Sequence, residues 1–294
     1  MIVRAAVVQD SAFPFDAQAS LALALEWITR VADGGAKLAV FPEAFLGGGY
    51  PKGLDFGVRV GMRSDEGRCQ FQHYFDSAVA VPGPETQALA NAAKTHSLWI
   101  VMGTIEREGG TLYCSVLYFS PSTGLCGKHR KLMPTAMERL IWGFGDGSTI
   151  PVIDTGFAKL GAVICWENYM PMLRMAMYGQ GIELYCAPTV DDRETWLPTM
   201  RHIALEGRCF VLSACQYAPQ IRGNSVIVDP FGKILAGPLR DEAGMLTADL
   251  DLDEIARGKF DLDVAGHYSR PDIFELMVKR SARLPVKFTE ESAD

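Results

Sequence analysis

Short, continuously apolar segments alternate along this chain with longer amphipathic ones, and this alternation constrains the fold most. Residues 2–8 predict a buried strand, and residues 18–32 predict a helix with Leu21, Leu25 and Ile28 on one face. The same patterns predict further strands at 38–41, 99–103, 112–119, 159–164, 183–187, 210–214 and 223–228, and helices at 86–95, 170–178 and 195–207. Strands that are apolar throughout are buried on both faces, so this order predicts an α/β protein.

The 294 residues contain neither a Ser/Gly/Pro-rich linker nor a repeat of fixed period. We therefore expect one domain over residues 1–280 and a peripheral polar tail over 281–294. The first ten residues lack the features of a signal peptide, and no apolar run approaches the ~20 residues of a membrane span. A cytoplasmic protein with no membrane partner is the expectation.

Composition and cysteine spacing exclude several classes of function. The net charge of −7 argues against a nucleic-acid partner, because phosphate binding relies on clustered basic side chains. The seven cysteines include no Cys-x-x-Cys pair, and the sequence has no His-Glu-x-x-His, Gly-x-Ser-x-Gly or P-loop motif. We expect no metal and no cofactor, and six of the cysteines are interpreted as small buried hydrophobes.

Polar side chains follow two of the predicted strands at the edge where α/β sheets carry their active sites. Glu43 follows the strand at 38–41, and Cys165 follows the strand at 159–164, just before a predicted helix. A thiol there is a candidate nucleophile, and a partly buried Glu43 is a candidate base. The alternatives are a cysteine buried in the core and a carboxylate that caps a helix or lies in a solvated loop.

The basic segment 128–131 is a third candidate. Most charge runs are solvated, and we expect Lys128, His129 and Arg130 to be so. Lys131 adjoins an apolar stretch and is a candidate for stabilising negative charge in a dry cleft. His129 is an alternative base for Cys165, and Glu138 belongs either to the same site or to an exposed helix.

Together these segments resemble the nitrilase superfamily, and within it the nitrilase branch. The resemblance rests on residues 41–45, 129–132 and 163–168, and on the longer segments 48–53, 138–143, 145–148, 201–208 and 266–272. It runs in constant order from about residue 2 to 277. It implies a four-layer αββα sandwich in which Glu43, Lys131 and Cys165 converge, with Glu138 as a second glutamate of the site.

The resemblance also implies a reaction. Cys165 attacks a nitrile carbon and forms a thioimidate and then a thioester, with Glu43 as base and with Lys131 and the backbone N–H of Trp166 stabilising charge. Candidates for the pocket wall are Tyr50, Trp166, Thr189 and Trp196, each with core packing as its alternative. An aromatic wall favours a small aromatic or arylaliphatic nitrile. An amidase or an N-carbamoyl amino-acid hydrolase is the alternative, and a silent scaffold is a third possibility.

The resemblance implies a homodimer or a larger homo-oligomer. Two features depart from the nitrilase pattern: the short segment 217–221, where many nitrilases carry an insertion, and the short C-terminus. Because those regions help to form filaments in the family, we do not expect long filaments here.

Overall fold

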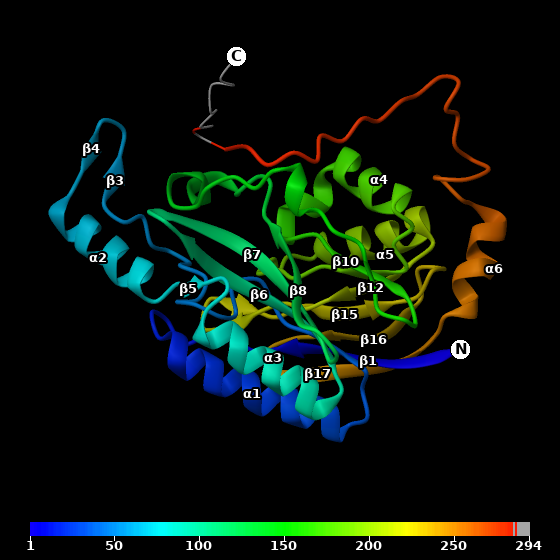
Figure 1. The fold of residues 1–294 in the computed structure, drawn as a ribbon, viewed down its shortest axis with the longest axis horizontal. Coiled ribbons are helices and arrows are strands. Elements are labelled where there is room, and N and C mark those ends of the chain that lie inside the picture. The colour runs from blue at the N-terminus through cyan, green and yellow to red at the C-terminus, as the bar shows by residue number, and fades with distance from the viewer. Residues whose placement is uncertain (285, 287–294) are drawn as a thin grey trace, which may run out of the picture.

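The computed structural model describes residues 1–284 and 286. Within them, two large β-sheets pack face to face, and helices cover the outer face of each sheet (Figure 1). This arrangement is the αββα sandwich that the family resemblance implied. No helix of the described residues is long and apolar enough to cross a membrane.

The first sheet has three parallel strands at its centre and antiparallel strands at its edges. In spatial order it contains β17 (Gly244–Asp251), β1 (Ile2–Gln9), β2 (Leu38–Val40), β6 (Trp99–Glu108), β7 (Thr111–Ser120) and β8 (Gly124–Arg130), with the short β5 (Val79–Ala80) beside β6. Helices α1 (Ala17–Asp33) and α3 (Pro84–His96) cover its outer face.

The second sheet repeats this plan around another parallel trio. Its spatial order is β16 (Ile234–Leu239), β15 (Ser225–Val228), β12 (Phe210–Ser213), β11 (Leu184–Cys186), β10 (Lys159–Ala162) and β9 (Ile153–Asp154). Helices α4 (Pro171–Gly179) and α5 (Trp196–Gly207) cover its outer face.

The remaining elements are short or peripheral. They are the hairpins β3 (Val58–Arg59) with β4 (Met62–Arg63) and β13 (Tyr217–Ala218) with β14 (Ile221–Arg222), the helices α2 (Asp65–Asp76) and α6 (Asp253–Asp261), and the 3₁₀ turns η1 (Ala136–Leu140), η2 (Gly147–Thr149) and η3 (Cys165–Tyr169). The turns η1 and η3 carry site residues.

Three apolar cores fill the three spaces between the four layers. Side chains on a strand alternate between its two faces, so neighbouring residues enter different cores. Val7 packs between the two sheets, whereas Val8 packs against α1. On β11, Leu184 faces the other sheet and Tyr185 faces α4 and α5. This double burial explains why the central strands are apolar throughout.

Every strand and helix predicted from the sequence is present, with ends shifted by a few residues. The sequence did not predict α2, whose buried residues are only Gly67 and Tyr74, or β17 and α6, whose side chains are mostly half-buried or exposed. The strands predicted from the sequence also do not include β8, which forms an edge of the first sheet. The boundary proposed at residue 280 stays a prediction, because residues 285 and 287–294 lie outside the described part.

Candidate active site

Glu43 lies at the carboxyl end of β2, and its carboxylate is fully buried. The neighbouring strand β6 passes so close that a Cβ on Gly103 would lie 1.9 Å from the carbonyl oxygen of Pro42. On the other side, Gln216 Nε2 donates to the carbonyl oxygen of Glu43 at 2.7 Å. The position of this carboxylate is therefore set by the backbone on both sides.

Lys131 follows β8 and brings a buried ammonium to the same place. Its Nζ donates to Glu43 Oε1 at 2.7 Å and to Glu138 Oε2 at 2.8 Å. Burial alone would lower the pKa of Lys131, but the charges around it, that of Glu43 foremost, hold it well above its usual value. The ammonium has a third N–H that neither carboxylate uses.

Cys165 begins the turn η3 at the carboxyl end of β10. Its backbone has a φ of +49°, a left-handed conformation that costs a residue with a side chain on the order of 1 kcal/mol. The backbone N–H of Cys165 donates to the carbonyl oxygen of Pro188 at 2.8 Å, which holds the turn in that shape. Burial, and then the charge of Glu43, raise the pKa of the thiol.

One oxygen of Glu43 is free to take a proton. Oε1 accepts from Lys131 and from the buried thiol of Cys114, whereas Oε2 has no hydrogen-bond partner among the described residues. Burial raises the pKa of Glu43; the charge of Lys131 partly offsets this effect, and that of Glu138 adds to it. The Cys165 thiol acts in the opposite direction and lowers the pKa of this carboxyl group. A carboxylate with a raised pKa beside a thiol has the properties of a general base.

Glu138 lies on the turn η1, opposite Glu43. Its Oε2 accepts from Lys131 and from the backbone N–H of Thr135 at 2.6 Å, and its Oε1 accepts from the hydroxyl of Tyr50 at 2.7 Å. The structure thus places the four residues predicted as catalytic around one point, and Tyr50 extends the network toward the pocket.

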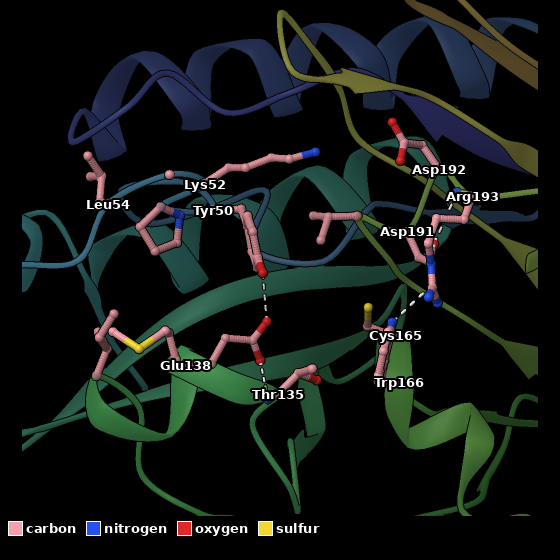
Figure 2. A pocket seen from close by; sticks show the side chains of 15 residues that line it. Tyr50, Lys52, Leu54, Thr135, Glu138, Cys165, Trp166, Asp191, Asp192 and Arg193 are labelled. Atoms are coloured by element: carbon pink, nitrogen blue, oxygen red, sulfur yellow. Dashed lines mark hydrogen bonds and ion pairs between the residues drawn. The ribbon is translucent and has the colours of Figure 1, made fainter.

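A pocket of about 440 Å³ leads to this group (Figure 2). Tyr50 and Glu138 lie on one side of it, and Cys165 and Trp166 lie on the other. The indole N–H of Trp166 donates to Asp191 Oδ2 at 3.0 Å, and the guanidinium of Arg193 lies over the indole ring. The apolar part of the lining consists of Pro51, Leu54, Met137, Ile141 and Val190.

Two candidates for the pocket wall lie elsewhere. Trp196 is the first residue of α5, and its side chain is fully buried in the core between that helix and the second sheet. Its indole N–H donates to Ser213 Oγ at 2.9 Å. The prediction that Trp196 lines the pocket wall is therefore wrong. Its contact with the pocket is indirect, because its ring packs on Tyr169, which packs on Trp166. Thr189 also does not line the pocket; its hydroxyl lies 3.2 Å from the sulfur of Cys165.

His129 is not the solvated residue that the charge run predicted, because it is fully buried. Its Nδ1 lies 2.6 Å from the carbonyl oxygen of Thr149, and its Nε2 lies 2.9 Å from Glu167 Oε2. Because a carbonyl and a carboxylate only accept hydrogen bonds, both ring nitrogens carry protons and the ring is an imidazolium. It therefore has no lone pair with which to act as a base for Cys165.

Lys128 and Arg130 are also not solvated as predicted. Both pair with Glu106, whose carboxylate is buried on β6, and Arg130 stacks on the ring of Tyr113. The prediction failed because the pairing of β7 with β6 and β8 places an acidic residue beside the basic segment.

Glu167 is a structural residue of the site that the sequence analysis missed. Its Oε1 accepts from the backbone N–H of Leu132 at 2.6 Å, and its Oε2 accepts from that of Ile164 at 3.0 Å as well as from His129. One carboxylate thus connects the segment after Lys131, on the first sheet, to the turn that carries Cys165, on the second. The sequence did contain a signal for this role, because Glu167 is a carboxylate only two residues after the predicted nucleophile Cys165.

We expect Glu167→Gln to destabilise the protein by about 3 kcal/mol, because removal of one partner leaves a buried charge or an unpaired donor. Urea denaturation of the variant and of the wild type measures the difference. A loss below about 1 kcal/mol would show that the pair with His129 is dispensable.

The same pair predicts a pH dependence. Burial lowers the pKa of His129, but the charge of Glu167 and the hydrogen bonds more than offset this and raise it. The pair therefore contributes its full stabilisation of the folded protein at pH values below the pKa of an unfolded histidine, about 6.5. It is lost as the pH rises through the raised pKa of the folded state. The stability difference between wild type and Glu167→Gln should accordingly shrink from pH 6 to pH 9; a constant difference contradicts the imidazolium assignment.

The described residues contain no group of three or more His, Cys, Asp or Glu side chains arranged to hold a metal ion. The carboxylates of Glu43 and Glu138 instead share the ammonium of Lys131.

Comparison with known proteins identifies strong similarities over the whole described fold. The sequence model of the family described as carbon-nitrogen hydrolase matches residues 4–260. An "Aliphatic nitrilase" from Sinorhizobium fredii (strain HH103) is 54% identical, with 96% of this chain and 97% of the relative covered. "Nitrilase 2" from Arabidopsis thaliana is 50% identical, with 98% of this chain and 91% of the relative covered.

Among solved structures, an amidase from Nesterenkonia sp. AN1 in complex with acrylamide superimposes with a TM-score of 0.69 at 22% identity. The match covers 88% of this chain and 95% of the amidase. At that identity the likeness supports the fold alone.

Proposed function

This chain belongs to the nitrilase branch of the carbon-nitrogen hydrolase family, and from that premise we propose that it hydrolyses a nitrile through covalent intermediates on Cys165. The observation that carries the proposal is a buried thiol that lines a pocket and lies close enough to Glu43 and Lys131 for both charges to act on its ionisation. A nucleophile, a base and a charge stabiliser thus lie together.

In the first half of the reaction, Glu43 takes the thiol proton and the thiolate adds to the nitrile carbon. The proton passes to the nitrile nitrogen, which gives a neutral thioimidate. The free N–H of Lys131 and the backbone N–H of Trp166 stabilise the charge that develops on that nitrogen. Lys131 cannot drift toward solvent, because two buried carboxylates hold its ammonium.

In the second half, a water activated by Glu43 adds to the thioimidate and forms a tetrahedral intermediate. Ammonia leaves, and the thioester that remains is hydrolysed by a second water to the carboxylic acid and the free thiol. Glu138 orients Lys131, and the hydroxyl of Tyr50 fixes Glu138 from the pocket side. Overall, one nitrile and two water molecules are converted into one carboxylic acid and one ammonia.

The pocket lining favours an aromatic or arylaliphatic nitrile. The rings of Tyr50 and Trp166 line the pocket together with aliphatic side chains such as Leu54 and Val190, and the charged side chains of the lining include Lys52, Asp192 and Arg193. Such a surface suits an apolar ring on a short linker. A purely aliphatic nitrile is the second candidate, supported by the similarity to the aliphatic nitrilase of Sinorhizobium fredii.

A panel of nitriles tests the substrate class. We expect ammonia release from phenylacetonitrile to exceed that from a short aliphatic nitrile such as butyronitrile by about tenfold in kcat/KM, because burial of a ring contributes at least 1.4 kcal/mol. Matched amides and N-carbamoyl amino acids serve as comparison. Turnover of those compounds without turnover of any nitrile would favour the amidase or N-carbamoyl hydrolase alternative.

Substitution of the nucleophile tests the covalent mechanism. Cys165→Ala and Cys165→Ser should both abolish ammonia release from every nitrile, because alanine has no nucleophile and a serine hydroxyl is not deprotonated under these conditions. Cys114→Ala, which removes the other thiol that contacts Glu43, is a matched control and should keep Cys165 reactive. Substantial turnover by Cys165→Ala would overturn the mechanism.

Substitution of the base gives an independent test. Glu43→Gln keeps the shape of the side chain and removes the proton acceptor, so we expect kcat to fall by about 10² to 10⁴. Circular dichroism checks that the fold is kept. Activity within tenfold of the wild type would point to Glu138 as the group that accepts the proton.

A further inference from the structure

The geometry points to Thr189 as a further catalytic residue, whose hydroxyl donates a hydrogen bond to the sulfur of Cys165 and stabilises the thiolate. The inference rests on the proposed function, because it assigns Thr189 to the step in which Cys165 loses its proton. It also changes the role expected from the sequence, which placed Thr189 in the pocket wall.

The direction of the hydroxyl proton follows from the neighbours of Thr189. The backbone N–H of Asp191 donates to Thr189 Oγ1 at 2.9 Å, which occupies the oxygen as an acceptor. The hydroxyl has one hydrogen of its own, and Cys165 Sγ lies 3.2 Å away as its acceptor. Thr189 is fully buried, so water does not compete for this hydrogen.

The backbone around Thr189 holds that hydroxyl in place. The N–H of Thr189 donates to the carbonyl oxygen of Ala214 at 2.9 Å, and its carbonyl oxygen accepts from Gln216 at 3.1 Å. Asp191, whose backbone orients the hydroxyl, is fixed in turn by the indole N–H of Trp166 and by Arg193 (Figure 2). The donor thus lies on the same segment as Asp191 and Arg193, which line the pocket.

Such a donor contributes more after the thiol ionises than before. A neutral sulfur is a weak acceptor, whereas a thiolate accepts a charge-assisted hydrogen bond. An interaction that strengthens as charge develops on the nucleophile lowers the barrier of the step. Burial and the charge of Glu43 raise the pKa of Cys165, and the hydrogen bond from Thr189 acts in the opposite direction.

Other ionisable groups also act on this sulfur and must stay unchanged in a test. Glu43, Lys131 and Glu138 influence its ionisation from the side of the first sheet. Tyr50 and Arg193, which line the pocket, also interact electrostatically with this sulfur, as does Cys215, which follows β12 of the second sheet. Variants confined to Thr189 leave all six in place, so a changed pH profile reports on the hydroxyl.

Two variants separate the hydroxyl from the packing of the side chain. Thr189→Ser keeps the hydroxyl and loses the methyl group, whereas Thr189→Val keeps the methyl group and loses the hydroxyl. The readout is the rate at which iodoacetamide alkylates Cys165, mapped by mass spectrometry between pH 6 and pH 9.5. This readout requires no knowledge of the natural substrate.

For Thr189→Val we expect alkylation about tenfold slower near pH 7, and a curve of alkylation rate against pH that is displaced by about one pH unit to higher pH. The reason is that the thiolate, a charged group, loses one hydrogen bond. Thr189→Ser should stay within about threefold of the wild type. Ser213→Ala, which removes another buried hydroxyl from the second sheet, is the matched control and should keep the wild-type profile.

Three outcomes would overturn the inference. They are a wild-type rate in Thr189→Val, a loss in Thr189→Ser as large as that in Thr189→Val, and a rate in Thr189→Val that is reduced by the same factor at every pH. The last outcome indicates a distorted loop, since the backbone N–H of Asp191 also loses its acceptor. Failure of the proposed function is distinguishable, because Cys165→Ala then retains turnover whatever the Thr189 variants do.

Discussion

The ammonium of Lys131, held between the carboxylates of Glu43 and Glu138, is the interaction on which the rest of the site depends. Transfer of a single charge into a protein interior costs several kcal/mol, so three buried charges are tolerable only in a well-defined geometry. Gly103 and Gln216 fix Glu43, and Thr135 and Tyr50 fix Glu138. The ammonium is therefore held before substrate arrives, as electrostatic stabilisation of a developing charge requires.

The second constraint is that the reacting groups come from different sheets. Glu43 and Lys131 belong to the first sheet, and Cys165 belongs to the second, so their separation depends on how the sheets pack. Glu167 fixes this relation locally, because its carboxylate binds the backbone on both sides and the buried imidazolium of His129. Thr189 adds a contact from the second sheet to the sulfur itself.

Sequence reasoning was accurate where a residue type and its position relative to a strand carry the information. It identified the central strands, because strands buried on both faces are apolar throughout. It singled out Glu43 and Cys165 because they follow such strands at the edge where α/β sheets carry their active sites. It failed for Lys128, His129 and Arg130, because the residues that neutralise them, Glu106 and Glu167, are distant in the chain.

The sequence by itself determined the α/β alternation, the family resemblance and the four residues of the site, Lys131 with its buried ammonium among them. The tertiary structure alone decided which side chains meet. It buried His129 as an imidazolium, placed Trp196 in the core and turned the Thr189 hydroxyl toward the Cys165 sulfur. The physical reason is that apolar periodicity is a local property of the chain, whereas a hydrogen bond or an ion pair depends on how distant segments pack.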